Sequence, residues 1–95
     1  MHPFEASWDR ARSHLGAAER ALGGAPHPAR AEYRDWLEHN ELELALDALE
    51  AAGADLGAGP EFCRALVAAA AEMGLAEHGA RYASRLAGGS GDAEA

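Results

Sequence analysis

Helix-forming residues dominate this chain, and the residues that favour strands are almost absent from it. Alanine fills 25 of the 95 positions, Val67 is the single valine, and there is no isoleucine or threonine. Alanine is the strongest helix former, whereas β-branched residues are enriched in strands. We therefore predict an all-α fold, a compact bundle of four to five helices with short loops. A chain of this length makes one domain that buries a modest core.

Proline, glycine and apolar residues at helical spacing set the bounds of five predicted helices. These helices span residues 3–22, 28–39, 41–52, 60–73 and 75–87. Residues 88–95 (GGSGDAEA) offer nothing to bury. We therefore predict a single helical domain over 1–87 and a disordered tail over 88–95.

Each predicted helix has an apolar face that we assign to the core. The stripe on the first helix comprises Phe4, Trp8, Ala11, Leu15, Ala18 and Leu22. The faces of the second and third comprise Tyr33, Trp36 and Leu37, then Leu42, Ala45, Leu46 and Leu49. Those of the last two comprise Phe62, Leu66, Ala69, Ala70 and Met73, then Leu75, Gly79, Tyr82 and Leu86.

The predicted third helix begins after Asn40, and its start has the pattern of a capping box. The Asn40 side chain would accept the backbone N–H of Glu43, and Glu43 would reach back toward Asn40. Gly53 would end this helix, and residues 53–59 would form a loop. Leu44 lies away from the core face, so it either packs beneath a neighbouring helix or is exposed as an anchor for a partner.

The net charge of −8 is concentrated in one third of the chain. Between residues 32 and 61 the only cation is Arg34, and the seven acids and seven arginines elsewhere balance. Concentrated charge repels itself, so this segment is either a binding surface for a basic partner or a solvated face that confers solubility. The nine acids of the segment are Glu32, Asp35, Glu38, Glu41, Glu43, Asp47, Glu50, Asp55 and Glu61.

No pattern of catalytic or metal-binding residues is recognisable in this chain, and we expect no catalytic residue, metal or cofactor. Its five histidines lack the i, i+4 spacing of helical zinc ligands. Cys63, the single cysteine, lies near a helix start without a base that the sequence places beside it, so we expect it in the core. The glycines of residues 53–59 lack the Lys and Ser/Thr of a phosphate-binding loop.

Composition also bears on the source and location of the protein. One cysteine allows no internal disulfide and fits a reducing cytosol. The chain has no apolar run long enough to span a membrane, no signal-peptide pattern and no lysine, so we expect a cytoplasmic protein from a GC-rich bacterium. An acidic chain is also a poor ligand for nucleic acid or anionic lipid.

Residues 33–49, with the sequence YRDWLEHNELELALDAL, resemble a pattern in small bacterial immunity proteins of the MafI-like kind. The pattern is an apolar helix end, a polar turn, and then Glu41, Ala45, Leu46 and Leu49 at the spacing of that family. The helix that starts at Pro60 and the break at Gly74 resemble the second half of the family, so the likeness covers about residues 30–75. It implies a compact helical protein that binds and neutralises a cognate toxin.

Charge and resemblance predict the same mechanism. Toxins that act on nucleic acid have basic clefts, which an acidic helical surface would block without any chemistry of its own. The alternative is a structural or adaptor domain that self-associates into a homodimer while its acidic face is merely solvated. The predicted partner-binding residues are Glu38, Glu41, Glu43, Asp47, Glu50 and Asp55, with Tyr33 and Trp36 as aromatic anchors.

Overall fold

The structure, a computed structural model, describes residues 3–24 and 26–94, and the side chains of residues 8–24 and 26–86. All the regular elements in these residues are helices, so the predicted all-α fold is confirmed. The helices are α1 (Pro3–Ala21), α2 (Pro28–Glu38), α3 (Leu42–Leu56), α4 (Pro60–Met73) and α5 (Ala76–Glu94).

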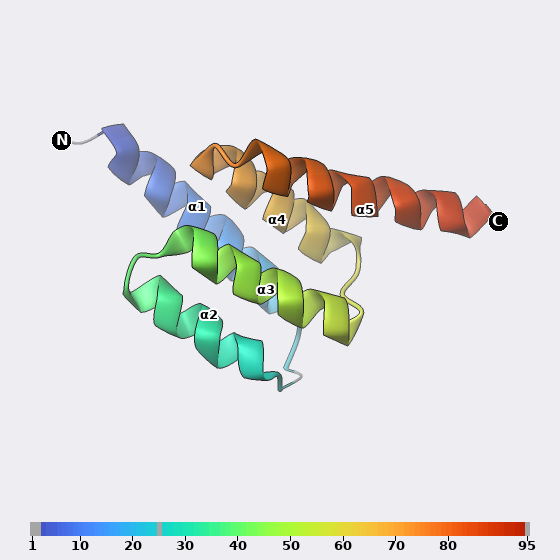
Figure 1. Cartoon of the computed structure of the whole chain (residues 1–95), viewed down its shortest axis with the longest axis horizontal. Helices are drawn as coiled ribbons and strands as arrows, with labels where there is room; N and C mark the ends of the chain where they lie inside the picture. The colour runs from blue at the N-terminus through green and yellow to red at the C-terminus, as the bar shows by residue number, and fades with distance from the viewer. Residues whose placement is uncertain (1–2, 25, 95) are drawn as a thin grey trace.

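Two helical hairpins and the first helix make up the bundle (Figure 1). Helices α2 and α3 pack along each other as one hairpin, and α4 and α5 pack as the other. Helix α1 packs mainly along α4 and also touches α3, so it links the two hairpins. The start of α1, the α2–α3 turn and the α4–α5 turn all lie at the left end of Figure 1, opposite the C-terminus.

The apolar faces meet in one continuous core, as their spacing predicts. On α1, Ala11, Leu15 and Ala18 have no exposed surface, but Trp8 from the same stripe is 45% exposed. The assignment of Trp8 to the core is therefore wrong, and the burial of Phe4 lies outside the described side chains. The largest fully buried side chains are Tyr33, Tyr82, Leu15, Leu46, Leu49 and Leu66.

The exposure of Trp8 follows from the unequal lengths of α1 and α4. The two helices run antiparallel, and Arg10 on α1 binds Glu72 near the end of α4. Helix α4 ends at Met73, so it cannot cover the first turns of α1, which extend past that point. The i, i+3, i+4 pattern of a helix identifies an apolar face but does not say how far along that face a neighbouring helix reaches.

The predicted capping box at Asn40 is wrong, because Asn40 ends α2 instead of capping α3. Asn40 has a left-handed backbone, with φ of 59°. Its N–H donates to Leu37 O, and the N–H of Glu41 donates to Trp36 O, which is the hydrogen-bond pattern of a Schellman motif. The Asn40 side chain instead accepts a hydrogen bond from Arg12 at 2.8 Å. Glu41 is the N-cap of α3 and makes no side-chain cap bond.

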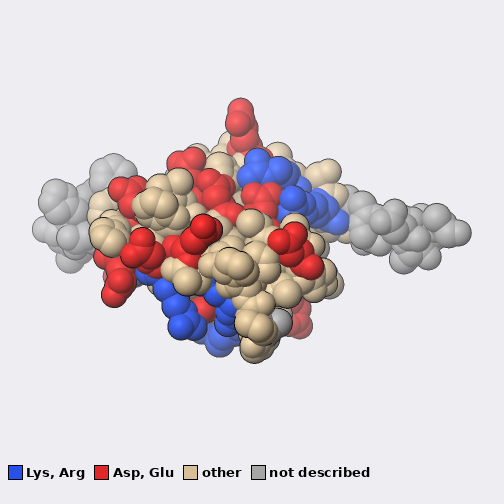
Figure 2. All heavy atoms as spheres, turned by 60° about the horizontal axis from the view of Figure 1, so that its bottom comes forward, with Lys and Arg blue, Asp and Glu red and all other residues tan. Residues whose placement is uncertain are grey.

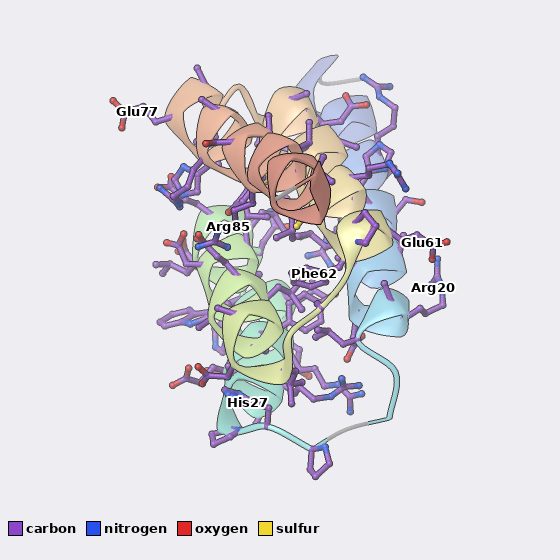
Figure 3. The ribbon with its side chains drawn as sticks, turned by 90° about the vertical axis from the view of Figure 1, so that its right-hand side faces the viewer. Arg20, His27, Glu61, Phe62, Glu77 and Arg85 are labelled. Atoms are coloured by element: carbon purple, nitrogen blue, oxygen red, sulfur yellow. The ribbon has the colours of Figure 1, made fainter. Side chains whose placement is uncertain are left out.

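Helix α3 continues past Gly53, where the sequence predicts its end. It ends at Leu56, and the following Gly57 adopts the left-handed backbone that closes the helix, with φ of 66°. Gly53 lies inside the helix, where a Cβ atom would approach the ring of Phe62 to between 2.2 and 2.9 Å. Gly53 thus allows α4 to bring the Phe62 ring against the α3 backbone, where the ring is 2% exposed (Figure 3).

Helix α5 also extends beyond its predicted end. Its backbone is helical to Glu94, seven residues past the predicted end at residue 87. The side chains from residue 87 onward lie outside the described part of the structure. Among the described side chains of α5, Tyr82 is buried in the core and Leu86 is half-buried.

The close approach at Gly53 predicts a specific loss of stability. The substitution Gly53→Ala should lower the free energy of unfolding by up to about 2 kcal/mol, because overpacking costs about 1–3 kcal/mol while alanine recovers about 1 kcal/mol of helix propensity. Urea unfolding followed by circular dichroism measures the change. Gly79→Ala is the matched control, since its Cβ would meet Ala70 Cβ at an ordinary 3.8 Å. That variant should be neutral or more stable, and an equal loss in both variants would contradict the packing argument.

Candidate protein-binding surface

Glu43, Asp47 and Glu50 form an acidic stripe along α3, and side chains of α5 bind two of these three acids. Glu50 accepts hydrogen bonds from Arg81 at 2.8 Å and forms a second ion pair with Arg85 at 3.0 Å. Asp47 lies 3.0 Å from the Nε2 atom of His78. Figure 3 shows Arg85 reaching from α5 toward α3. Two of the carboxylates assigned to partner binding therefore hold α5 against α3.

The position of Glu50 makes it a structural residue. Its side chain is 14% exposed, whereas Arg81 and Arg85 are 45% and 43% exposed. The hydrogen bonds from Arg81 lower the pKa of Glu50 below its ordinary value, and the charges of both arginines act in the same direction against the effect of burial. A partner that used Glu50 would first have to displace these two guanidinium groups.

Other acids are paired with side chains of α2 or of the residue that precedes it. Asp55 lies 2.8 Å from Nε2 of His27, whose Nδ1 accepts the Ala29 N–H and so caps α2. Glu19 on α1 binds Arg34 at 3.1 Å. These pairs tie α1 and the α3 end to α2, so Asp55, another predicted contact, has a partner within the chain.

Three carboxylates around the α2–α3 turn are different. Glu38, Glu41 and Glu43 are exposed, and none forms an ion pair with any described residue. The guanidinium of Arg12 binds this turn by donating to Leu37 O and to the side chain of Asn40 at 2.8 Å each, and it forms no ion pair with the three carboxylates among the described contacts. In Figure 2 the acidic atoms gather over the left half of the molecule, the half in which this turn lies. We call Glu38, Glu41 and Glu43 the acidic turn.

The surroundings of His39, at the end of α2, raise the pKa of its imidazole. His39 is exposed, and its Nδ1 lies 2.8 Å from Asp35 O. This hydrogen bond and the charge of Asp35 raise the pKa of His39, with smaller contributions from Glu38 and Glu41. Asp35 is therefore the main cause of the raised pKa of His39, and two carboxylates of the acidic turn add to it.

An apolar groove lies beside the acidic turn. Trp8 of α1 lines it together with Leu42, Glu43 and residues 71–75 at the end of α4. A large exposed aromatic ring next to charged groups is the arrangement that provides binding energy in many protein interfaces. The groove follows from the helix lengths, because the 14-residue α4 cannot cover the whole of the 19-residue α1.

The two aromatic anchors predicted from the sequence have other positions. Tyr33 is 1% exposed and belongs to the core, so it cannot reach a partner while the bundle is folded. Trp36 is half-buried against the core. Leu44, which the sequence left undecided, is 40% exposed. The exposed apolar anchors near the acidic turn are therefore Trp8 and Leu44.

A second groove lies at the opposite end of the bundle. The end of α3, the α3–α4 loop, the start of α4 and the middle of α5 line it. Its charged lining residues are Arg64 and Arg85, and the half-buried Cys63 also lines it. Because no carboxylate or histidine is among these lining residues, they provide no general base for the thiol.

No family model, no curated protein sequence and no solved structure matches this chain. The arrangement of its residues is therefore the basis for any functional argument. Among the helices that the structure describes, none has the length and apolar composition to cross a membrane.

The ion pairs of Glu50 with Arg81 and Arg85 predict how the stability of the fold depends on pH. A carboxyl whose pKa is lowered on folding stabilises the fold above its unfolded pKa and loses that contribution as pH falls through the folded value. The substitution Glu50→Gln should therefore cost about 1 kcal/mol at neutral pH, since both arginines are partly exposed. It should also flatten the loss of stability below the ordinary pKa of 4.5. Urea unfolding across this pH range tests both points, and an unchanged pH profile would contradict the pairing.

We predict an elevated pKa for His39, because Asp35 and, to a smaller extent, Glu38 and Glu41 favour its protonated form. NMR titration of the imidazole should give a pKa above 6.5, and Glu41→Gln should lower it while leaving the histidine exposed. Protonation then favours the fold, so this contribution is present at low pH and is lost as pH rises through the folded pKa. A pKa of His39 at or below 6.5 would contradict the electrostatics described for the turn.

Proposed function

We propose that this protein is an inhibitor that binds a basic protein partner through the acidic turn and the adjoining Trp8 groove. The observation that carries the proposal is the sorting of the acids: Asp47, Glu50 and Asp55 are paired within the chain, but the acidic turn is not. Solvated acids could serve solubility from any part of the surface. A cluster left unpaired beside an exposed tryptophan favours a binding surface.

The partner that fits this surface is a toxin domain with a basic, nucleic-acid-binding cleft. Three neighbouring carboxylates would steer a cationic cleft toward the turn and occupy the place of substrate phosphates. Trp8 would then supply apolar contact beside the charged rim. The resemblance to immunity proteins of contact-delivered toxins supports the same class, and the inhibition requires no catalytic residue in this chain.

A second candidate is a self-associating adaptor domain, which the exposed Trp8 and Leu44 favour. They are 45% and 40% exposed. Two apolar side chains of this size could be covered by a second copy of the chain in a symmetric dimer. The acidic turns of two copies would repel each other if they met at that interface, which makes the inhibitor the better fit.

Charge reversal tests the inhibitor proposal. With a tagged chain, a toxin-type partner recovered from source lysate at low salt should bind with one-to-one stoichiometry, and its nuclease or related activity should fall on binding. Glu41→Arg with Glu43→Arg should slow association about tenfold or more, because the steering field is lost. Trp8→Ala should instead speed dissociation.

The matched control is Glu61→Arg, at the start of α4. Glu61 is exposed and, like the acidic turn, has no ion pair with a described residue, but it lies at the other end of α4 from the Trp8 groove (Figure 3). This variant should bind like the wild type. Equal binding by the double reversal and the control would contradict the proposed surface. No partner together with a stable dimer in light scattering would favour the adaptor.

A further inference from the structure

Three potential metal ligands from two helices converge beside the ion pairs that join α3 and α5. Glu43 and Asp47 lie one turn apart on α3, and His78 extends from α5. One ligand atom from each of these side chains lies within 4.8 Å of the other two. Among the described residues this is the one group of three or more such ligands that is this close.

The imidazole of His78 is held in place before any ion binds. Its side chain is 16% exposed. Its ring packs edge-on against Tyr82, with the ring centroids 6.3 Å apart and the planes at 65°. On its other side, Nε2 faces Asp47 Oδ1 at 3.0 Å. A ligand that packing has already oriented gives up less conformational freedom on binding a metal.

The spacing of the donor atoms suits a tetrahedral transition-metal ion. Ligands bound to Zn²⁺ at about 2.0–2.2 Å in that geometry lie about 3.4 Å from one another. Asp47 and His78 are hydrogen-bonded at 3.0 Å, so their donor atoms need to move apart by only about 0.4 Å to reach this spacing. Glu43 is exposed and has no ion pair with a described residue, so its carboxylate can rotate toward the other two ligands.

A buried polar group next to this cluster also lacks a partner. The hydroxyl of Tyr82, one turn after His78, is fully buried and has no hydrogen-bond partner among the described residues. Burial raises the pKa of this hydroxyl, and the charges of Glu50 and Asp47 act in the same direction, against that of Arg81. A buried hydroxyl without a partner calls for an explanation, and a bound water or ion nearby is one such explanation.

We propose that Glu43, Asp47 and His78 bind one divalent transition-metal ion of the Zn²⁺ type at the junction of α3 and α5. One imidazole nitrogen and two carboxylate oxygens form a donor set suited to Zn²⁺, whereas Ca²⁺ and Mg²⁺ prefer oxygen ligands alone. Water completes the coordination, because the site is open on the Glu43 side. The bound ion adds a link between α3 and α5. This inference does not depend on the proposed inhibitor function.

Zinc titration of the full chain tests the site. Isothermal titration with ZnCl₂ should show one saturable site per chain, and CoCl₂ should give the visible absorption of a tetrahedral ion. His78→Gln and Asp47→Asn should each weaken binding about tenfold or more, because each removes a ligand. Glu43→Gln should have a smaller effect, since that ligand is the most exposed. Circular dichroism of each variant checks that the helices remain folded.

The His27–Asp55 pair provides the matched control. It joins a histidine to a carboxylate at 2.8 Å, as His78 and Asp47 are joined, but it belongs to no group of three ligands among the described residues. Asp55→Asn should therefore bind Zn²⁺ like the wild type. An equal loss of affinity in Asp55→Asn, unchanged binding in His78→Gln, or no saturable Zn²⁺ binding by the wild type would each overturn the proposal. Because His78 lies outside the acidic turn, these outcomes are separate from those of the partner-binding test.

Discussion

Burial of the apolar face of α3 is the constraint on which the rest of this structure depends. Ala45, Leu46, Leu49 and Ala52 on this face have no exposed surface, and α2, α1 and α4 all pack against the helix. Once that face is buried, the helical period of 3.6 residues per turn fixes the direction in which the side chains of the acidic stripe project. The stripe then meets α5, whose basic side chains lie opposite it. Core packing therefore decides which charges become neighbours.

Because of this pairing of charges, the middle and the start of α3 have different properties. Near its middle, Glu50 is nearly buried beneath two arginines and contributes to the fold. At its start, Glu43 belongs to a turn that Arg12 holds from the α1 side without neutralising its carboxylates. Part of the formal charge of −8 is therefore left unpaired at this end of the bundle, next to the exposed Trp8. The proposed inhibitor surface and the proposed metal site lie side by side there and share Glu43.

The helix ends show how local signals and tertiary contacts compete. Gly57 and Gly74 end their helices in the left-handed backbone that glycine favours. The sequence pattern predicts Asn40 as the cap of the following helix, yet Asn40 ends the preceding one. Its left-handed backbone fits that role, and its side chain accepts a hydrogen bond from Arg12. Gly53 looked like a helix end, yet it lies inside α3 because the ring of Phe62 needs the space that a side chain would fill. Both errors arose where a residue far away in sequence decided the outcome.

The sequence by itself determined the all-α class, the number of helices, most of the core and the acidic character of residues 32–61. These properties follow from propensity, period and composition, which act over a few neighbouring residues. Only the tertiary structure decided that Tyr33 is buried, that Trp8 is exposed, and that Glu50 is paired while Glu41 is not. It also brought His78 next to Asp47, 31 residues away in the chain. Contacts of this kind depend on how far each helix reaches and which face meets it, and no local pattern encodes either.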